Sequence, residues 1–276
     1  MQRFGKLINV NIDWITATCS TADGRRRLQA HGELWIHDEL KQGNECVEWS
    51  SHGYIGLSCG SVQLGQRHDS LLLRVTGIDA HMKAPTVVQS ATNVSRIDFA
   101  STVKLRDGQK YFAEACEREA RRFKSKHNLV HQVELRRNTN TGNTVYLGRR
   151  VSDRFIRIYD KGAESRLEQF EGCWRAECQY NNKLAWSMAQ HANRTEWDLA
   201  WVHGVVQHEL ERKGVSWLEL QEQTQLNLSH TPKKLSTNAS RLLWLGQQVA
   251  PTVQKLLDQG LRAQVLEALH LTDEGE

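Results

Sequence analysis

Residues 144–164 read TVYLGRRVSDRFIRIYDKGAE and place two tyrosines among four arginines, one lysine and three carboxylates. The part RFIRIYDK has the alternation of a β-strand, in which successive side chains point to opposite faces. One face holds the two isoleucines, and the other holds Phe155, Arg157, Tyr159 and Lys161. The strand therefore has an apolar side for a core and a side on which a tyrosine lies among cations.

Two further segments repeat this division. The segment WRAECQY places Arg175 and Glu177 on one face, with tryptophan, alanine, cysteine and tyrosine on the other. The segment SRIDFA places Arg96 and Asp98 on one face, with isoleucine and phenylalanine behind them. If the three strands lie side by side, their polar faces form one surface of arginines, carboxylates and a tyrosine.

Such a surface has a chemical use. Carboxylates without histidine or cysteine suit a hard divalent cation such as Mg²⁺ or Mn²⁺, and arginines grip phosphate oxygens. Nearby cations are expected to lower the pKa of a phenol and so activate it as a nucleophile. Attack of Tyr159 on a DNA phosphodiester would give a phosphotyrosyl enzyme and a free 3′-hydroxyl. The structural alternative is a half-buried sheet with ordinary cross-strand ion pairs, in which tyrosine is a favoured residue.

The rest of the chain predicts an α+β fold. Apolar and β-branched runs at 8–20, 53–65 and 70–78 indicate an antiparallel meander, and 93–101 indicates another strand. A helix is expected over 109–127. After residue 181 the pattern turns helical, and in 240–271 apolar residues recur at helical spacing, interrupted by Pro251 and Gly260.

The expected architecture is an antiparallel β-sheet core with packed helices and an all-helical C-terminal part. We divide the chain into a β-rich DNA-nicking core, residues 1–181, and a helical part, residues 182–276. The net charge is only +4, yet adjacent arginines occur at four places in the first 150 residues. Such clusters suit a polyanion like the nucleic-acid backbone, although each is also explained as a solvated surface.

The sequence argues against a disulfide framework, a zinc or histidine metal site, a membrane span and a signal peptide. The six cysteines include no C-x-x-C pair, which argues against a disulfide framework or a zinc site and favours reduced, buried thiols. The twelve histidines include no H-E-x-x-H and no His-hydrophobe-His triplet. No window approaches the roughly 20 apolar residues of a membrane span, and no signal peptide is evident. We expect a cytoplasmic protein without a membrane partner.

The segment 144–164, followed by WRAECQY, resembles the core of the replication initiation factor family, Rep_trans. This family includes rolling-circle plasmid initiators, related relaxases of integrative elements and replication proteins of some filamentous phages. Its pattern runs Y-[LI]-G-S-R-x-S, then R-[IFL]-Y-[DEN]-K with an acid shortly after, then R-x-E. The matching residues here are Tyr146, Leu147, Gly148, Arg150, Ser152, Arg157, Ile158, Tyr159, Asp160, Lys161, Glu164, Arg175 and Glu177.

Other matches are weaker, namely NIDWITAT near the start, SRIDFA with Asp98, and VAPTVQKLLDQG near the end. One departure is visible, because Arg149 stands where the pattern usually has serine. The resemblance implies roles residue by residue, with Tyr159 as the nicking nucleophile. The catalytic set is Tyr159, Arg157 and Lys161; the metal ligands are Asp98, Glu177 and Glu164; the DNA-binding set is Arg96, Arg149, Arg150, Ser152 and Arg175. Tyr146 is the alternative nucleophile, although packing or base stacking is favoured for it.

The expected function is rolling-circle DNA replication initiation, or transfer, by a site-specific, metal-dependent nicking and joining endonuclease of the tyrosine relaxase or topoisomerase-like type. The enzyme would use Mg²⁺ or Mn²⁺, form a 5′-phosphotyrosyl intermediate, and act on single-stranded or melted origin DNA. No P-loop is present, so a host helicase and polymerase are expected partners. A homodimer is a further expectation from the relatives. The alternatives are a non-catalytic DNA-binding regulator and, with less support, an RNA-binding module.

Overall fold

The computed structural model describes residues 4–105, 111–138, 140, 142–215, 217, 219–220, 250–261 and 264. The chain divides into two compact units, Met1–Leu226 and Asn227–Glu276. In the second unit the described helix is α8 (Ala250–Asp258), which contains Pro251 and ends two residues before Gly260. The rest of the helical pattern expected over 240–271 lies outside the described residues, apart from short pieces.

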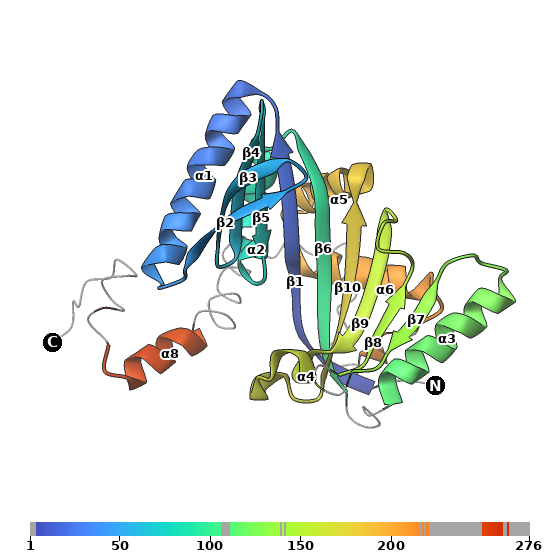
Figure 1. Ribbon diagram of the computed structural model, residues 1–276. Helices are drawn as coiled ribbons and strands as arrows, with labels where there is room; N and C mark the ends of the chain where they lie inside the picture. Colours follow the sequence, from blue (N-terminus) through green and yellow to red (C-terminus); the bar gives the residue numbers. More distant parts are fainter. Residues whose placement is uncertain are drawn as a thin grey trace. The chain divides into compact units, whose positions relative to one another are not determined.

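The first unit is built on one large sheet (Figure 1). Its strands are β1 (Phe4–Cys19), β2 (Cys46–Ser51), β3 (Tyr54–Cys59), β4 (Val62–Arg67), β5 (Ser70–Thr76), β6 (Asn93–Leu105), β7 (Val133–Arg136), β8 (Thr144–Leu147), β9 (Arg154–Asp160), β10 (Cys173–Asn181) and β11 (Glu219–Leu220). The order is β2-β3-β4-β5-β1-β6-β10-β9-β8-β7, with antiparallel neighbours throughout. Strand β11 pairs with β1 in parallel. The long strands β1 and β6 lie side by side in the middle of the sheet (Figure 1).

Helices cover one face of this sheet. They are α1 (Ala22–Lys41), α2 (Asp79–Ser90), α3 (Phe112–Lys126), α5 (Asn182–Arg194) and α6 (Leu199–Glu211). Their apolar residues join one hydrophobic core with Ile15, Ile97, Ile156 and Tyr180 from the strands. The short helix α4 (Lys161–Ser165) and the 3₁₀ turn η2 (Glu168–Phe170) connect β9 to β10. The opposite face of the sheet is left for the polar side chains that alternate with this core.

The α+β class is confirmed. The strand segments predicted over 8–20, 53–65 and 70–78 correspond to β1, to the hairpin of β3 and β4, and to β5, which are neighbours in the sheet, whereas β2 was not predicted. Two helices were not predicted. Helix α1 has a highly polar sequence and buries only a narrow stripe that includes Leu28, Gly32 and Ile36, so its apolar periodicity is weak. Helix α2 contains Pro85, a residue that argues against a helix interior. Packing against the sheet outweighs the weak local signal in both helices.

The two helices that follow β10 bury side chains in the same hydrophobic core as the sheet. Helices α5 and α6 bury Ala185, Ala189, Val202 and Val206 in it. Within the segment expected to be helical, β11 forms a short strand beside β1. The proposed division between residues 181 and 182 stays a prediction. Among the residues that the structure describes, no helix is both long enough and apolar enough to span a bilayer.

The expectation that all cysteines are reduced is wrong for one pair. Cys46 on β2 and Cys59 on β3 are directly opposite in the register, with Cα atoms 4.3 Å apart, and they form a disulfide. Their separation in sequence gave no C-x-x-C signal, because hairpin register rather than spacing brings them together. Cys19, Cys116, Cys173 and Cys178 are buried thiols outside this disulfide, as expected.

A buried polar contact on the helix side makes stability depend on pH. His203 of α6 has none of its surface exposed, and its Nδ1 lies 3.0 Å from the hydroxyl of Ser101 on β6. That hydroxyl also accepts a bond of 3.2 Å from the indole of Trp217. Burial lowers the pKa of His203 to about 4, from 6.5 for the free side chain. His203 is therefore neutral in the folded protein at pH 7.

We expect acid to destabilise the protein through His203. Between pH 6.5 and 4 the unfolded chain binds a proton at this side chain that the folded protein does not bind. The contribution is fully present above pH 6.5 and is lost as the pH falls to about 4, a change of roughly 3 kcal/mol. Urea unfolding at pH 7.5 and 4.5 should show a smaller acid loss for His203→Gln than for the wild type. Equal losses in the two proteins would contradict this assignment.

Candidate active site

The three strands predicted to share a polar face are neighbours in the sheet. Strand β10 lies between β6 and β9, and in its register Arg175 is opposite Tyr159 and Thr102, while Glu177 is opposite Arg157. Directly opposite residues of an antiparallel pair point to the same face and lie within contact distance. The register therefore gathers the candidate catalytic residues on the face away from the helices.

Glu177 is the centre of this cluster, which we call the Glu177 cluster. One carboxylate oxygen accepts hydrogen bonds from the hydroxyl of Tyr159 and from Nε of Arg175, the latter at 3.0 Å. The other oxygen pairs with the guanidinium of Arg157. Only 1% of the Glu177 side chain is exposed, so these three donors replace the water that a carboxylate needs. Tyr159 itself is buried, with 8% of its surface exposed.

Arg175 is held inside the protein by four side chains. It donates to Glu177, to Thr102 at 3.2 Å, to Asn11 at 3.1 Å and to Asp13 at 2.6 Å. Its side chain is 5% exposed. These contacts occupy the guanidinium, so Arg175 orients the carboxylates of the Glu177 cluster and is poorly placed to meet a phosphate from solvent.

Asn11 and Asp13 are site residues that the sequence did not single out. Both lie on β1 within NIDWITAT, one of the segments matched by the family pattern. The register of β1 against β6 shifts between Ile12 and Trp14, but Asn11 and Asp13, two residues apart, both contact Arg175 and therefore share a face. Burial raises the pKa of Asp13, but the charge of Arg175, with those of Arg157 and Lys161, outweighs it and holds the pKa below its usual value. Asp13 is thus a further carboxylate of this site.

Asp98 and Arg96 form a second, adjoining pair on β6. Nε of Arg96 lies 2.9 Å from Asp98, whose side chain is 1% exposed, and the guanidinium also covers the ring of Trp14 at 3.9 Å. Burial raises the pKa of Asp98 to about 6 against the effect of Arg96, and the charge of Glu177 adds to the rise. The two predicted carboxylates are therefore close enough to influence each other.

The expectation that cations lower the pKa of Tyr159 is wrong. Burial raises this pKa, the charge of Glu177 raises it further, and Arg175 only partly offsets the two. The sequence showed the cations but not the loss of water around the phenol. Tyr159 is a neutral phenol whose proton already points at a carboxylate, which is the geometry of a nucleophile with an adjacent base.

Lys161 and Glu164 lie beyond the strand. The strand ends at Asp160, whose carboxylate accepts a bond of 2.9 Å from the Ala163 amide and caps α4. Lys161, expected to continue the strand, is the first residue of α4, yet its ammonium group remains 5.9 Å from the centre of the Tyr159 ring. Glu164 accepts a bond of 2.7 Å from Lys161 and is 44% exposed.

The site contains carboxylate oxygens of the kind that bind a divalent cation, but these oxygens are not arranged around a common metal position. In the part of the chain that the structure describes, no group of three or more His, Cys, Asp or Glu side chains is placed to hold a metal. The carboxylates of Asp13, Asp98 and Glu177 are each paired with arginine. Oxygen donors of this kind fit Mg²⁺ or Mn²⁺, provided that at least one arginine moves away.

The predicted DNA-binding loop joins β8 to β9. The hydroxyl of Ser152 donates within the loop, to the carbonyl groups of Arg149, at 2.6 Å, and of Arg154. These bonds hold the loop in shape, and a DNA contact by Ser152 stays a prediction. Arg149 and Arg150 are exposed, and the guanidinium of Arg150 lies 5.5 Å from the centre of the Tyr146 ring. Two of the three loop residues thus remain available to a ligand.

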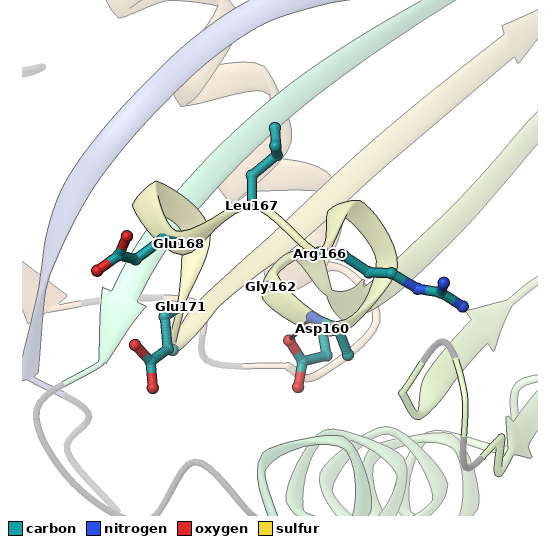
Figure 2. Close-up of a pocket in the computed structure, with 8 residues that line it drawn as sticks. Asp160, Gly162, Arg166, Leu167, Glu168 and Glu171 are labelled. Atoms are coloured by element: carbon teal, nitrogen blue, oxygen red, sulfur yellow. Dashed lines mark hydrogen bonds between the residues drawn. The ribbon is translucent and has the colours of Figure 1, made fainter.

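A pocket of about 300 Å³ follows Tyr159 in the sequence but does not include it. Figure 2 shows it between α4 and the chain that leads to β10, with Glu168 and Glu171 directed away from Arg166. Its lining residues are Asp160, Gly162, Ala163, Arg166, Leu167, Glu168, Glu171 and Gly172. Asp160 alternates with Tyr159 on β9 and so points to the other face. This pocket is separate from the Glu177 cluster.

Comparison with known proteins places this geometry in a family. The replication initiation factor family, Rep_trans, matches residues 92–267. The fold is similar to that of a rolling circle replication initiator protein from Geobacillus stearothermophilus, with a TM-score of 0.51 and 16% identity over 84% of this chain and 91% of that chain. No curated protein sequence matches the chain.

The family match covers more than half of the chain and includes β6, β9 and β10. It therefore contains the strands that carry Asp98, Tyr159 and Glu177, while β1 with Asn11 and Asp13 lies before it. Because the match has this extent, the chain belongs to the replication initiation factor family.

Proposed function

We propose that this protein starts rolling-circle DNA replication, or DNA transfer, by nicking one strand at an origin and remaining attached through Tyr159. The observation that carries the proposal is the hydrogen bond from the Tyr159 hydroxyl to Glu177, beside Arg157. It supplies a nucleophile, an acceptor for its proton and a cation for the phosphate. The fold shared with the rolling circle initiator from G. stearothermophilus supports the rolling-circle context.

In the proposed step the Tyr159 oxygen attacks the phosphorus of one phosphodiester in line with the 3′-oxygen. The phenolic proton passes to Glu177 as the oxygen–phosphorus bond forms. The bond from phosphorus to the 3′-oxygen breaks, and that oxygen takes a proton from water to become a free 3′-hydroxyl. The 5′-phosphotyrosyl link keeps the ester, so the reverse reaction rejoins the strand. Glu177 thus acts as proton acceptor, in addition to the metal role expected from the sequence.

Two of the arginines are exposed enough to bind a phosphate group of the DNA. The side chains of Arg96 and Arg157 are 26% and 39% exposed, whereas that of Arg175 is 5% exposed. We propose that Arg96 and Arg157 turn toward the phosphate when DNA binds, joined by Lys161. Bidentate pairing of guanidinium and phosphate would offset the carboxylate contacts that are given up. Arg175 would stay in place and keep Glu177 oriented.

The same movement would leave carboxylates free for a divalent cation. We propose that Asp98 and Glu177 hold Mg²⁺ or Mn²⁺, with Glu164 as a further ligand. A bound cation polarises a phosphoryl oxygen and stabilises the charge that develops there. The residues of the chain hold the cation, the phosphate and the phenol on one face of β6, β10 and β9.

We expect chelation and Asp98→Asn to suppress nicking. The amide keeps the shape of Asp98 but removes the charge that attracts the cation, so activity should fall by at least the roughly 10- to 100-fold seen when partners of metal ligands are changed. Glu164→Gln, at an exposed carboxylate on α4, is the matched comparison and should have the smaller effect. The measurement is the initial nicking rate as a function of Mg²⁺ and Mn²⁺ concentration. Unchanged metal dependence in Asp98→Asn would remove Asp98 from the site.

The test of the function is covalent capture. Purified protein with Mg²⁺ or Mn²⁺ is mixed with labelled single-stranded oligonucleotides that tile both strands of its own gene and flanks. Denaturing gels and peptide mass mapping then locate any adduct. An adduct on Tyr159 that disappears with chelator supports the proposal, and one on Tyr146 keeps the function but moves the nucleophile. Specific binding without any adduct favours a non-catalytic DNA-binding regulator.

The proposed nicking reaction also suggests which partners, cellular setting and DNA substrate the protein would have. Because the sequence has no P-loop, we propose that a host helicase unwinds the DNA and a host polymerase extends the 3′-hydroxyl. The proposed setting is the cytoplasm, where a plasmid or phage would replicate, and the protein would act as a monomer or homodimer. Origin DNA that is single-stranded or melted at the nick is the proposed substrate.

A further inference from the structure

A second pocket lies on the polar face, at the edge formed by β7 and β8. It has a volume of about 200 Å³ and is lined by Gln132, Glu134, Arg136, Tyr146, Gly148, Arg149, Arg150 and Phe155. Tyr146 and Phe155 stack with ring centres 5.6 Å apart and planes at 15°. The pocket therefore contains a flat aromatic surface, of the kind on which a nucleic-acid base stacks.

Positive charge surrounds this aromatic surface. The guanidinium groups of Arg136 and Arg150 lie 5.2 and 5.5 Å from the centre of the Tyr146 ring. Glu134 accepts a bond of 2.6 Å from Arg136, and with Arg149 the pocket has three cations and one carboxylate. The Arg136 side chain is 59% exposed and Arg150 is also exposed, so both can move aside for a flat ligand. The excess of positive charge favours a ligand with a phosphate.

The loop that brings these arginines back over Tyr146 depends on Gly148. This residue has φ of +99°, a region that favours glycine, and its amide donates to the carbonyl of Gln132 at 2.8 Å. A Cβ atom there would lie 3.1 Å from the carbonyl oxygen of Arg154. The glycine thus allows the chain to reverse immediately after β8, and places Arg149 and Arg150 at the pocket.

The pocket adjoins the Glu177 cluster. Tyr146 is directly opposite Arg157 in the pairing of β8 with β9, and Arg157 contacts Glu177. Tyr159 lies two residues further along β9, so strand geometry puts it roughly 8 Å from Tyr146 along the diagonal of the sheet. That distance spans about two nucleotides of a stacked strand.

We propose that this pocket binds one unpaired nucleotide of the cleaved DNA strand, about two nucleotides from the scissile phosphate. The base stacks on Tyr146, and Arg136 and Arg150 hold its phosphate and cover its other face. The inference rests on the proposed nicking of a DNA strand at Tyr159 and adds the site that positions this strand. It also assigns Tyr146 to stacking, leaving Tyr159 as the nucleophile.

The first experiment uses oligonucleotides that each lack one base around the nick, assayed for single-turnover nicking. With the wild type, loss of one particular base within about two nucleotides of the nick should slow the reaction roughly 10- to 100-fold. Tyr146→Ala should show the same loss on intact DNA and no further loss on that abasic DNA. Tyr146→Phe keeps the ring and should match the wild type.

Two results would overturn the inference. One is a Tyr146→Ala protein that nicks intact DNA at the wild-type rate. The other is a Tyr146→Phe protein that loses the covalent adduct, because the hydroxyl of Tyr146 would then be the nucleophile. Arg150→Ala should weaken DNA binding and lower its salt dependence by about one phosphate contact. Arg194→Ala, at an exposed and isolated arginine of α5 outside the pocket, is the control and should change neither.

A second experiment separates this inference from the proposed function. The base analogue 2-aminopurine, placed at each position of the bound strand, loses fluorescence when it stacks. We expect quenching at one position in the wild type and in Tyr159→Phe, and its loss in Tyr146→Ala. Quenching that depends on Tyr146 in a protein that nicks nothing would retain the pocket and reject the nickase. Nicking with no position quenched by Tyr146 would reject the pocket alone.

Discussion

Tyr159→Phe should abolish the covalent protein–DNA adduct while leaving DNA binding within about twofold of the wild type. The substitution removes one oxygen atom, without which no bond to phosphorus can form. The ring stays in place, and Glu177 keeps its contacts with Arg157 and Arg175, so its charge is not left unpaired. Loss of one hydrogen bond should change the free energy of unfolding by only about 1 kcal/mol. The measurements are adduct yield on denaturing gels and binding to the same oligonucleotide.

The matched control is Tyr54→Phe. Tyr54 is also a buried strand tyrosine, and its hydroxyl bonds with Ser70 at 2.8 Å on β5, away from the Glu177 cluster. This variant loses a comparable hydrogen bond and should form the adduct at the wild-type rate. An adduct that persists in Tyr159→Phe would place the nucleophile on another residue. A protein that acts normally in cells with Tyr159→Phe would instead be a DNA-binding regulator.

Arg175→Ala should produce the largest loss of stability, about 3–5 kcal/mol in the free energy of unfolding. The alanine leaves Asp13 without its ion pair and Glu177 with one donor fewer, in a region where the removed side chain was 5% exposed. Glu177, with 1% of its side chain exposed, cannot regain water without rearrangement of the strands, whereas Asp13 is 23% exposed and loses less. Urea unfolding at pH 7.5, followed by circular dichroism, measures this difference.

Arg136→Ala provides the comparison for this stability effect. Arg136 also pairs with a glutamate, but its side chain is 59% exposed, so its loss should cost less than about 1 kcal/mol. Combining Arg175→Ala with Asp13→Asn should recover part of the loss, because the amide is easier to bury unpaired than the carboxylate. A change below about 1 kcal/mol in Arg175→Ala would contradict the network of contacts described for this residue.

The alternation of residues along single strands determines the polar face. In RFIRIYDK, SRIDFA and WRAECQY, side-chain direction follows from strand geometry alone, so Arg157, Tyr159, Asp98 and Glu177 can be assigned to one face from local sequence. The order of strands that makes this face continuous was an assumption, and the register of β10 with β6 and β9 confirms it. The part of the meander from β3 to β5 was likewise predictable, since turn residues and apolar runs are local signals.

Burial and register were decided only by the tertiary structure. Neither the raised pKa of Tyr159 nor the enclosure of Arg175 is visible in sequence, because both depend on how much water the neighbouring strands exclude. Asp13 joins the Glu177 cluster through its ion pair with Arg175, a residue far away in the sequence, and Cys46 meets Cys59 through a hairpin register. The sequence by itself thus determined which residue types share a face; the packing of distant segments decided which of them are buried, paired and able to exchange a proton.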